Sequence, residues 1–392
     1  MSDRRLKFFT ASDDQIQSGS VTDIYFLRTK QVLEARGLNK RVRVEVVAKG
    51  LPAGYEWAVC AGLEDGLHLL DGCPISVEGL PEGSLFRAYQ PVLSIEGRYL
   101  DFGLHETALL GFLCQASGVA TKAARLRTLV GEKPLIHFGA RRMHPAIAPM
   151  VDRSAYIGGC DGVAVVLSAD MLGIVPSGTI PHALVLQMGD TLDAARAFHE
   201  IIDPAVRRVA LIDTFLDEKF EAIRLAEGLG DALWALRLDT PSSRRGNFAK
   251  ILQEVRWELD LRGFENLKLL VSGGLDEADI PALLPWAEAF GIGTSIANAP
   301  VIDLSLDIVE IEGEPIAKRG KESGGKQLLT CRTCHTEVIA PIRKPVRSCR
   351  SCGTELSLLT VSLMENGRIT APLPTPAEIR ERTLAQLRGK TL

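Results

Sequence analysis

The sequence predicts an α/β protein with three parts: an N-terminal α+β sandwich-like domain, a central TIM-like βα barrel, closed or incomplete, and a small cysteine-rich C-terminal region. Three observations support this prediction. Short apolar runs alternate with amphipathic helical segments between residues 135 and 300, which is typical of parallel strands joined by helices. Alternating apolar and charged residues precede this region, and closely spaced cysteines follow it. We expect the parts to span residues 1–112, 113–300 and 301–392.

The composition is that of an ordinary globular protein large enough to bury a sizeable core. The chain has 392 residues, of which 46% are hydrophobic and 24% charged. A formal net charge of -4 provides no overall attraction to nucleic acid or to anionic membranes. We find neither a secretory signal nor an apolar run of the roughly 18–20 residues that span a bilayer. The expected location is therefore cytoplasmic.

The N-terminal part combines helical and strand patterns. The segment "SVTDIYFLRTKQVLEARGL" (20–38) has a helical pattern. In "RVRVEVVA" (41–48), valines recur at every second position, which predicts a strand with one wet face. A long segment, "ETALLGFLCQASGVATKAARLRTLV" (106–130), carries apolar residues on most faces and is expected to form a well-buried helix.

The central part contains about seven apolar runs, close to the eight strands of a closed barrel. The runs are "LIHFGA", "GVAVVLS", the stretch around "IVPSGT", "VALIDT", "LWALRLDT", "LKLLVSGG" and "FGIGTS". Its clearest helix is "GNFAKILQEVRWELDLRG" (246–263), which is apolar on one face. Active sites of βα barrels lie where the strands end, so polar residues directly after the runs are the candidates for function. They are Arg141, Arg142, Ser177, Gly178, Thr179, His182, Asp213, Thr214, Arg237, Asp239, Thr240, Ser272, Gly273, Gly274, Gly291, Gly293 and Thr294.

These residue types indicate a sugar-phosphate substrate. "VSGGLDEADI" and "FGIGTSIAN" are glycine loops on the last two expected strands, where backbone N–H groups can converge on a phosphate. Arg237 and Asp239, two residues apart, lie on one strand face. The aspartate suits ribose hydroxyls, and arginines bind phosphate or carboxylate oxygens. A surface ion pair and two purely structural turns remain the alternatives.

A single histidine stands out in "VPSGTIPHALV" (175–185). His182 follows a Ser-Gly-Thr turn and lies beside aliphatic residues, a setting in which histidines more often pack than react. A neutral imidazole is nevertheless a competent nucleophile near pH 7. The residue pattern leaves both roles open.

The eight cysteines fall into two groups. Four are scattered in apolar or turn surroundings, as expected for ordinary reduced thiols. The other four form two C-x-x-C pairs that can place four thiolates around one structural zinc ion: Cys331, Cys334, Cys349 and Cys352. Two disulfides are the alternative, which a cytoplasmic location disfavours. Basic residues between 318 and 350 leave open a nucleic-acid-binding zinc ribbon, although no aromatic residues interleave with them for base stacking.

The order of several blocks resembles that of the nicotinate phosphoribosyltransferase family, in the archaeal and bacterial type with a four-cysteine tail. The matching blocks are "VTDIYFLRTKQVLE", "HETALLGFLCQASGVATKAAR", "HFGARRMHPAIAPMVDRSAYIGGCDG", "SGTIPHALV", "RLDTPSSRRGNFAKILQEVRWELDLRG", "SGGLD" and "FGIGTSIAN". The resemblance implies an enzyme that converts nicotinate and phosphoribosyl pyrophosphate to nicotinate mononucleotide and pyrophosphate in NAD biosynthesis. It also implies magnesium with phosphoribosyl pyrophosphate and ATP, and ATP as a co-substrate.

The resemblance also implies roles for individual residues. His182, in the Gly-Thr-x-x-His block with Thr179, would be phosphorylated by ATP. Phe138 would stack on the pyridine ring, with Arg141 and Arg142 facing the carboxylate and the pyrophosphate. The family further implies a homodimer with shared active sites, or a higher oligomer. Its remaining assignments are ring-pocket closure by a partner subunit's Asp23 and Tyr25, ribosyl contacts from Arg237 and Asp239, and 5′-phosphate contacts from Ser272, Gly273, Gly274, Gly293 and Thr294.

Two departures from the family pattern concern the substrate contacts. Thr240, Pro241 and Ser242 stand where the more widespread form has Ser-Gly-Asp, and His137 stands where many relatives have an acidic residue. Quinolinate phosphoribosyltransferase, which has a similar architecture but lacks the Gly-Thr-x-x-His block and uses no ATP, remains an alternative. Nicotinamide as the substrate is another, although the arginine pair favours an anion.

Overall fold

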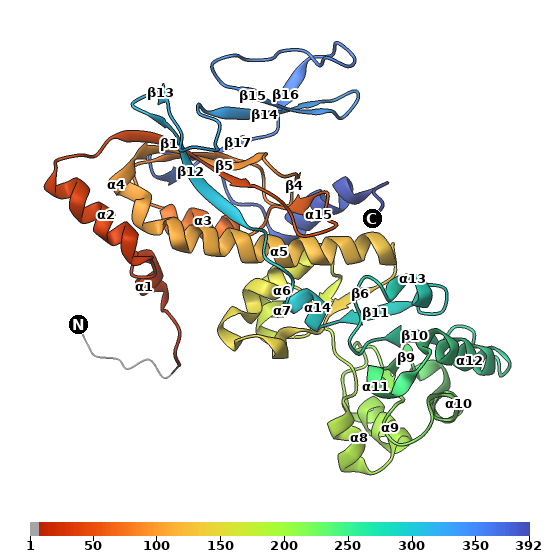
Figure 1. Cartoon of the computed structure of the whole chain (residues 1–392). Coiled ribbons are helices and arrows are strands. Elements are labelled where there is room, and N and C mark those ends of the chain that lie inside the picture. Colours follow the sequence, from red (N-terminus) through yellow and green to blue (C-terminus); the bar gives the residue numbers. More distant parts are fainter. Residues whose placement is uncertain (1–7) are drawn as a thin grey trace. The chain divides into compact units, whose positions relative to one another are not determined.

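The computed structural model describes residues 8–392 and divides into two compact units (Figure 1). The first unit combines the chain up to Thr121 with Pro300–Gln386, and the second contains Lys122–Ala299 and the last six residues. Helix α5 (Glu106–Val130) contributes residues to both units. No helix in the described part of the chain has the length and apolarity needed to cross a membrane.

The first unit is built on a seven-stranded sheet in which all pairings are antiparallel. The sheet order is β13 (Glu314–Pro315), β12 (Leu304–Ile311), β1 (Arg41–Ala48), β5 (Pro91–Arg98), β3 (Ser76–Gly79), β17 (Val361–Glu365) and β18 (Arg368–Ile369). The expected alternation in 41–48 is confirmed, because Val42, Val44 and Val46 of β1 are buried. They belong to a core that also takes in Leu67 and Leu109. This unit has the α+β character predicted for the N-terminal part, but it also contains Pro300–Gln386, which we expected to form a separate region.

The helices of the first unit and a short two-stranded sheet complete it. The helices are α1 (Asp13–Gln17), α2 (Ile24–Ala35), α3 (Leu63–Leu70), α4 (Tyr99–Phe102) and α15 (Pro376–Leu387), and the strands are β2 (Ala58–Val59) and β4 (Leu85–Phe86). A three-stranded sheet, in the order β15 (Glu337–Pro341), β14 (Lys326–Cys331) and β16 (Leu356–Leu358), carries the clustered cysteines.

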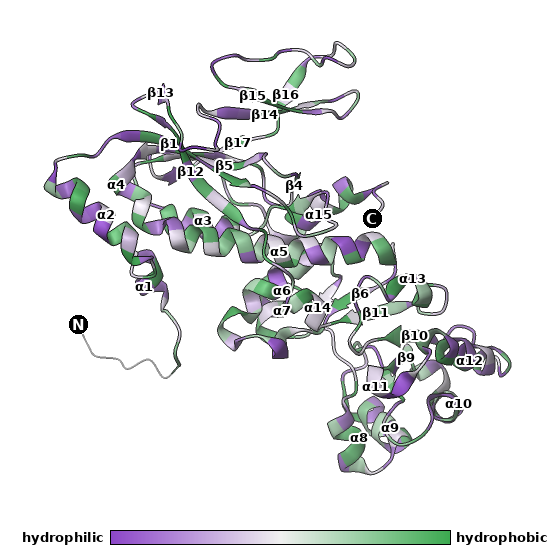
Figure 2. Cartoon of the chain, viewed as in Figure 1, coloured by the Kyte–Doolittle hydropathy of each residue, from purple (hydrophilic) through white to green (hydrophobic). Residues whose placement is uncertain are grey.

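The second unit is an incomplete barrel of six parallel strands. Their order is β7 (Gly162–Val163), β6 (Leu135–His137), β11 (Ala289–Ile292), β10 (Lys268–Val271), β9 (Ala235–Leu238) and β8 (Val209–Leu211). The central strands consist mainly of hydrophobic residues (Figure 2). Helices follow most of them: α6 (Ala148–Ile157), α7 (Val166–Leu172), α8 (His182–Met188), α9 (Thr191–Ile201), α10 (Glu218–Leu229), α11 (Ser242–Arg245), α12 (Phe248–Asp260), α13 (Ile280–Leu283) and α14 (Thr294–Ala297).

One of the seven expected strands, around "IVPSGT", is not a strand. Pro176 and Pro181 supply no backbone N–H, which disfavours regular pairing. The segment between them nevertheless contacts both edge strands. Ser177 donates its backbone N–H to Val163 of β7 (2.8 Å), and Ile180 donates to Val209 of β8 (3.1 Å). An irregular segment therefore lies between the edges of the open sheet and carries the residues that precede His182.

Candidate active site

The candidate site is centred on the side chain of Arg237, in β9. Its Nε donates to Ser272 Oγ (2.9 Å) and its Nη1 to Thr179 Oγ1 (2.8 Å). Its Nη2 lies 2.9 Å from Asp239 Oδ2, and Ser272 donates its hydroxyl to the other oxygen of the same carboxylate (2.7 Å). One largely buried arginine therefore connects the ends of β9 and β10 with the irregular segment. The sequence predicted all four residues, but not that they would form one network.

Phe138 lies against this network. The guanidinium carbon of Arg237 is 5.4 Å from the centre of the Phe138 ring, within the range of cation–π attraction. The ring occupies the space beside Gly291 of β11, where an added Cβ would lie 2.3 Å from a ring carbon. Gly291, the first glycine in "FGIG", is therefore required for packing the aromatic ring.

His182 is the first residue of α8 and is paired with an aspartate. Its Nε2 lies 3.3 Å from Asp213 Oδ1, with the histidine side chain 43% exposed and that of Asp213 4% exposed. Burial raises the pKa of Asp213, an effect that the nearby His182 partly offsets. Asp213 had been identified from the sequence as a strand ending, but its pairing with His182, 31 positions earlier in the numbering, had no local sequence signal. A half-exposed imidazole oriented by a buried carboxyl group is accessible to a ligand.

The two glycine loops follow β10 and β11, as the sequence predicted. Gly273 and Gly274 have φ values of 92° and 69°, in the region that favours glycine. A Cβ on Gly273 would lie 3.0 Å from the backbone oxygen of Asp239, and one on Gly293 would lie 3.2 Å from that of Phe138. Each loop therefore lies directly against a segment of the Arg237 network.

The first loop is also held through the residues that follow it. Lys122 Nζ lies 2.8 Å from Glu277 Oε1, and Arg125 Nη2 lies 2.7 Å from Glu277 Oε2. Burial acts to raise the pKa of Glu277, but hydrogen bonds from the two cations outweigh it, so that the pKa lies below its usual value. These contacts fix the loop to the part of α5 that belongs to the second unit, and the sequence analysis did not identify them.

The remaining candidates lie outside the network. Arg141 and Arg142 are exposed and belong to a 3-10 turn, Ala140–Arg142, directly after Phe138 and Gly139. Thr294 begins α14 after Gly293.

Asp23 and Tyr25 belong to the first unit, at the start of α2. The backbone N–H of Asp23 donates to Thr107 Oγ1 (3.1 Å), and the Tyr25 side chain is half-exposed.

The histidine that departs from the family pattern has a buried partner. His137 Nδ1 lies 2.6 Å from Asp152 Oδ1 of α6, and both side chains are fully buried. A buried ionisable group needs such a partner. His137 is therefore accommodated within the fold by a residue whose role the sequence analysis did not recognise.

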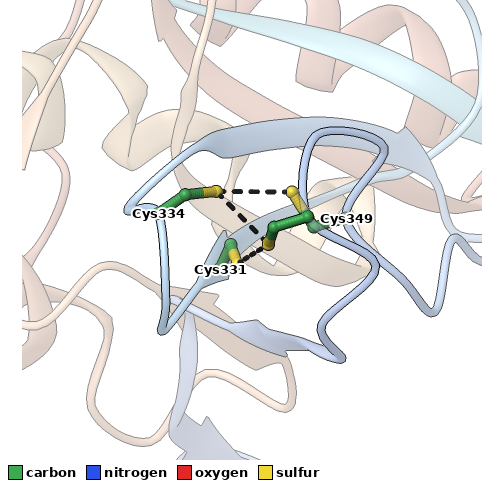
Figure 3. A group of neighbouring side chains, drawn as sticks. Cys331, Cys334 and Cys349 are labelled. Carbon is green, nitrogen blue, oxygen red and sulfur yellow. Dashed lines mark hydrogen bonds between the residues drawn. The ribbon is translucent and has the colours of Figure 1, made fainter.

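The four clustered cysteines converge as predicted, with all four sulfur atoms within 4.8 Å of one another (Figure 3). The Cys331–Cys352, Cys334–Cys349 and Cys334–Cys352 sulfur separations are 3.3, 3.5 and 3.6 Å. Tetrahedral zinc with Zn–S bonds of about 2.3 Å requires sulfurs about 3.8 Å apart, so the four thiols fit a zinc ion after small adjustments. A hydrogen bond with Thr336 lowers the pKa of Cys334, and one with Thr354 lowers that of Cys352, which favours the thiolates that bind metal. The pKa of Cys331 is instead raised to about 11, because desolvation and hydrogen bonds with the neighbouring thiols favour its protonated form. No disulfide joins these cysteines.

Comparison with known proteins identifies the family. Residues 23–117 match the model of the quinolinate phosphoribosyl transferase N-terminal domain, and residues 119–307 match that of the C-terminal domain. Together these matches cover more than half of the chain. The chain is 29% identical over 381 residues to nicotinate phosphoribosyltransferase pncB1 from Mycobacterium tuberculosis, covering 85% of this chain and 83% of that protein.

Two solved structures resemble the whole chain. A nicotinate-nucleotide pyrophosphorylase from Pyrococcus furiosus is 50% identical, with a TM-score of 0.96 and 98% of each chain covered. Human nicotinic acid phosphoribosyltransferase shares the fold, with a TM-score of 0.72, 20% identity, and coverage of 94% of this chain and 93% of that chain. The chain therefore belongs to the quinolinate phosphoribosyltransferase family, as an enzyme similar to the family's nicotinate phosphoribosyltransferases.

Proposed function

We propose that the enzyme transfers the phosphoribosyl group of phosphoribosyl pyrophosphate to nicotinate, forming nicotinate mononucleotide and pyrophosphate for NAD biosynthesis. The ring nitrogen forms a bond to ribose C1 as the bond from C1 to the pyrophosphate oxygen breaks. The observation that carries this proposal is the Arg237 network, which combines an aromatic ring, a buried arginine–aspartate pair and two glycine loops. This set suits an aromatic acid and a sugar phosphate, and the curated relatives support the assignment.

The residues of the network and the candidates outside it each have a role in this proposal. Phe138 stacks on the pyridine ring, and Arg141, with Arg142, neutralises the nicotinate carboxylate and the pyrophosphate. Arg237 and Asp239 hold the ribosyl group. Magnesium, which we propose accompanies phosphoribosyl pyrophosphate and ATP, would neutralise phosphate charge. Ser272, Gly273, Gly274, Gly293 and Thr294 provide the contacts to the 5′-phosphate.

The ATP-coupled step of the proposal depends on His182. Its imidazole accepts a phosphoryl group from ATP, and hydrolysis of the phosphohistidine drives transfer forward, releasing ADP and phosphate. Asp213 orients the imidazole through Nε2 and stabilises its positive charge, so that Nδ1 remains available as the nucleophile. Thr179, bonded to Arg237, links the segment preceding this histidine to the ribosyl site. These features support classifying the enzyme as an ATP-coupled ligase as well as a pentosyltransferase.

A substrate panel tests the assignment. Nicotinate, nicotinamide and quinolinate are each incubated with phosphoribosyl pyrophosphate and magnesium, with and without ATP. We expect nicotinate to be preferred over nicotinamide, because the exposed arginines favour an anion, and over quinolinate, because the curated relatives are nicotinate enzymes. We also expect ATP to stimulate its turnover. If only quinolinate is converted, and ATP has no effect on the rate, the proposal is wrong and the enzyme is a quinolinate phosphoribosyltransferase. A preference for nicotinamide would show that Arg141 and Arg142 do not select a carboxylate on the substrate.

We further propose that the active enzyme is a cytoplasmic homo-oligomer, at least a dimer, whose partner subunit supplies Asp23 and Tyr25 to close the ring pocket. Exposed apolar side chains on α2 support an interface there. They include Ile24, Tyr25 and Val32, which are 55%, 55% and 61% exposed. An interface core is enriched in such apolar and aromatic residues.

We assign the four-cysteine cluster to a structural zinc ion, because four thiolates leave no open coordination position. Nucleic-acid binding by the basic residues around it is the remote alternative. A salt-sensitive gel shift of DNA or RNA with the full-length enzyme would favour that alternative, and solvated surface charge predicts no shift.

A further inference from the structure

A second arginine contacts the first glycine loop. Arg245 is the last residue of α11, and its Nη1 donates to the backbone oxygen of Gly273 (2.6 Å). Its guanidinium carbon also lies 4.7 Å from the ring centre of Phe248, a buried residue of α12. A hydrogen bond and a cation–π contact together hold a planar group in one orientation. Neither the sequence analysis nor the network around Arg237 accounts for this arrangement.

We propose that Arg245 is a positioning residue for the 5′-phosphate contacts of the proposed function, on which this inference rests. The peptide between Gly273 and Gly274 is trans, so its carbonyl and its N–H point in opposite directions. Fixing the Gly273 oxygen on Arg245 therefore directs the Gly274 N–H away from the arginine. A Cβ on Gly274 would meet nothing within 4 Å, so there is open space beside this residue for an anion.

The loop depends on an external contact because its own backbone is unusually free. Two consecutive glycines with positive φ have many alternative conformations, and one hydrogen bond from a fixed guanidinium selects among them. Among residues 8–392, the contacts of the Arg245 side chain are those with Gly273 and Phe248.

The neighbouring arginine provides a matched control. Arg244 lies on the same short helix and is exposed. We expect Arg245→Ala to raise the KM for phosphoribosyl pyrophosphate and the Kd for ribose 5-phosphate, each by about tenfold, the value of one charged hydrogen bond. The KM for nicotinate should not change. Arg245→Lys should restore part of the affinity, and Arg244→Ala should match the wild type.

Calorimetric binding of ribose 5-phosphate separates this inference from the proposed function, because it needs no turnover. If Arg245→Ala binds ribose 5-phosphate about tenfold more weakly than the wild type, while neither converts nicotinate, the proposed function fails and the positioning role stands. If the wild type does not bind ribose 5-phosphate, or if Arg245→Ala leaves its Kd unchanged, the positioning role is overturned. A parallel rise in the KM for nicotinate would also overturn it, since it would indicate a general disturbance of the site.

Discussion

At the scale of single residues, the pairing of His182 with Asp213 leads to a prediction about how the enzyme uses ATP. We predict that His182→Ala abolishes ATP hydrolysis and the stimulation by ATP, but leaves slow nucleotide formation and normal folding. The variant lacks the phosphoryl acceptor, whereas the ribosyl contacts of Arg237 remain. Coupled assays of ADP release and nicotinate mononucleotide formation test this prediction, and full ATP stimulation in the variant would return His182 to a packing role.

The buried aspartate of this pair makes a separate prediction. Asp213→Asn keeps the shape of the side chain but removes the charge that stabilises a positively charged imidazole. Since one pKa unit corresponds to about tenfold in equilibrium, we expect the ATPase rate to fall by about tenfold or more, with the Kd for phosphoribosyl pyrophosphate unchanged. An unchanged ATPase rate would show that the 3.3 Å contact has no role in phosphoryl transfer.

A partly buried glutamate gives a pH dependence of stability. Burial, reinforced by the charge of Asp307, raises the pKa of Glu106 to about 7 from 4.5. The folded state then binds more protons than the unfolded state between these values, so the free energy of unfolding falls as pH rises through this window. Glu106→Gln removes the ionisation. Its Tm relative to wild type should increase from pH 4.5 to pH 7 and remain constant above it. A constant difference across that range would contradict the raised pKa.

At the scale of secondary-structure elements, we predict that replacing two glycines of α5 by alanine has opposite effects on the free energy of unfolding. A Cβ on Gly118 would lie 2.4 Å from the backbone oxygen of Pro300, whereas one on Gly111 would meet nothing within 4 Å. Gly118→Ala should therefore lower the free energy of unfolding by about 2 kcal/mol or more through overpacking. Gly111→Ala should raise it by about 0.5–1 kcal/mol, because alanine favours the helix. Denaturant titrations of both variants measure the difference, and equal effects would mean that the helix is free to shift away from Pro300.

We predict that the sheet carrying the four clustered cysteines is stabilised by a bound zinc ion. We expect about one zinc ion per chain in protein purified without chelators under reducing conditions. Cys349→Ser should lose the metal and lower the Tm, because Cys349 belongs to a small core with Leu329 and Ala340 that has few other contributors. Cys160→Ser, which changes a buried cysteine of the other unit, should keep the zinc. If Cys349→Ser still contains about one zinc ion per chain, the four cysteines do not form the zinc site.

Elements with a clear hydrophobic periodicity could be predicted from the sequence, whereas contacts that depend on long-range packing could not. The alternation in 41–48 and the apolar face of 246–263 correspond to β1 and α12. The run "IVPSGT" was apolar enough to imply a strand, but its prolines prevent pairing. In "GVAVVLS", only Gly162–Val163 pair as a strand, because α7 begins at Val166. The pairings made by Asp213, Asp152 and Arg245 had no sequence signal, since only the fold brings these residues to their histidines or loop.

At the scale of the whole molecule, shared active sites can be tested by mixing two variants. Tyr25→Ala and Arg237→Ala are each expected to be poorly active, because one lacks the closing residue and the other lacks the ribosyl contact. If the partner subunit supplies Tyr25, a mixed dimer contains one intact site. Co-refolded equal mixtures should then recover about a quarter of wild-type activity, from random pairing. Verified mixed dimers without recovery would show that Tyr25 acts within its own subunit or not at all.

The discontinuity of the first unit has a consequence for biosynthesis. In its sheet, β1 pairs with β12, with Val44 opposite Ile308, and the main segment of the second unit, Lys122–Ala299, is encoded between them. During translation, at about 5–20 residues per second, β1 waits on the order of tens of seconds for its neighbour to leave the ribosome. Throughout that interval the β1 edge presents unpaired backbone N–H and C=O groups, which are prone to pair with other chains. The nascent chain is therefore most in need of a chaperone after β1 has emerged and before β12 has.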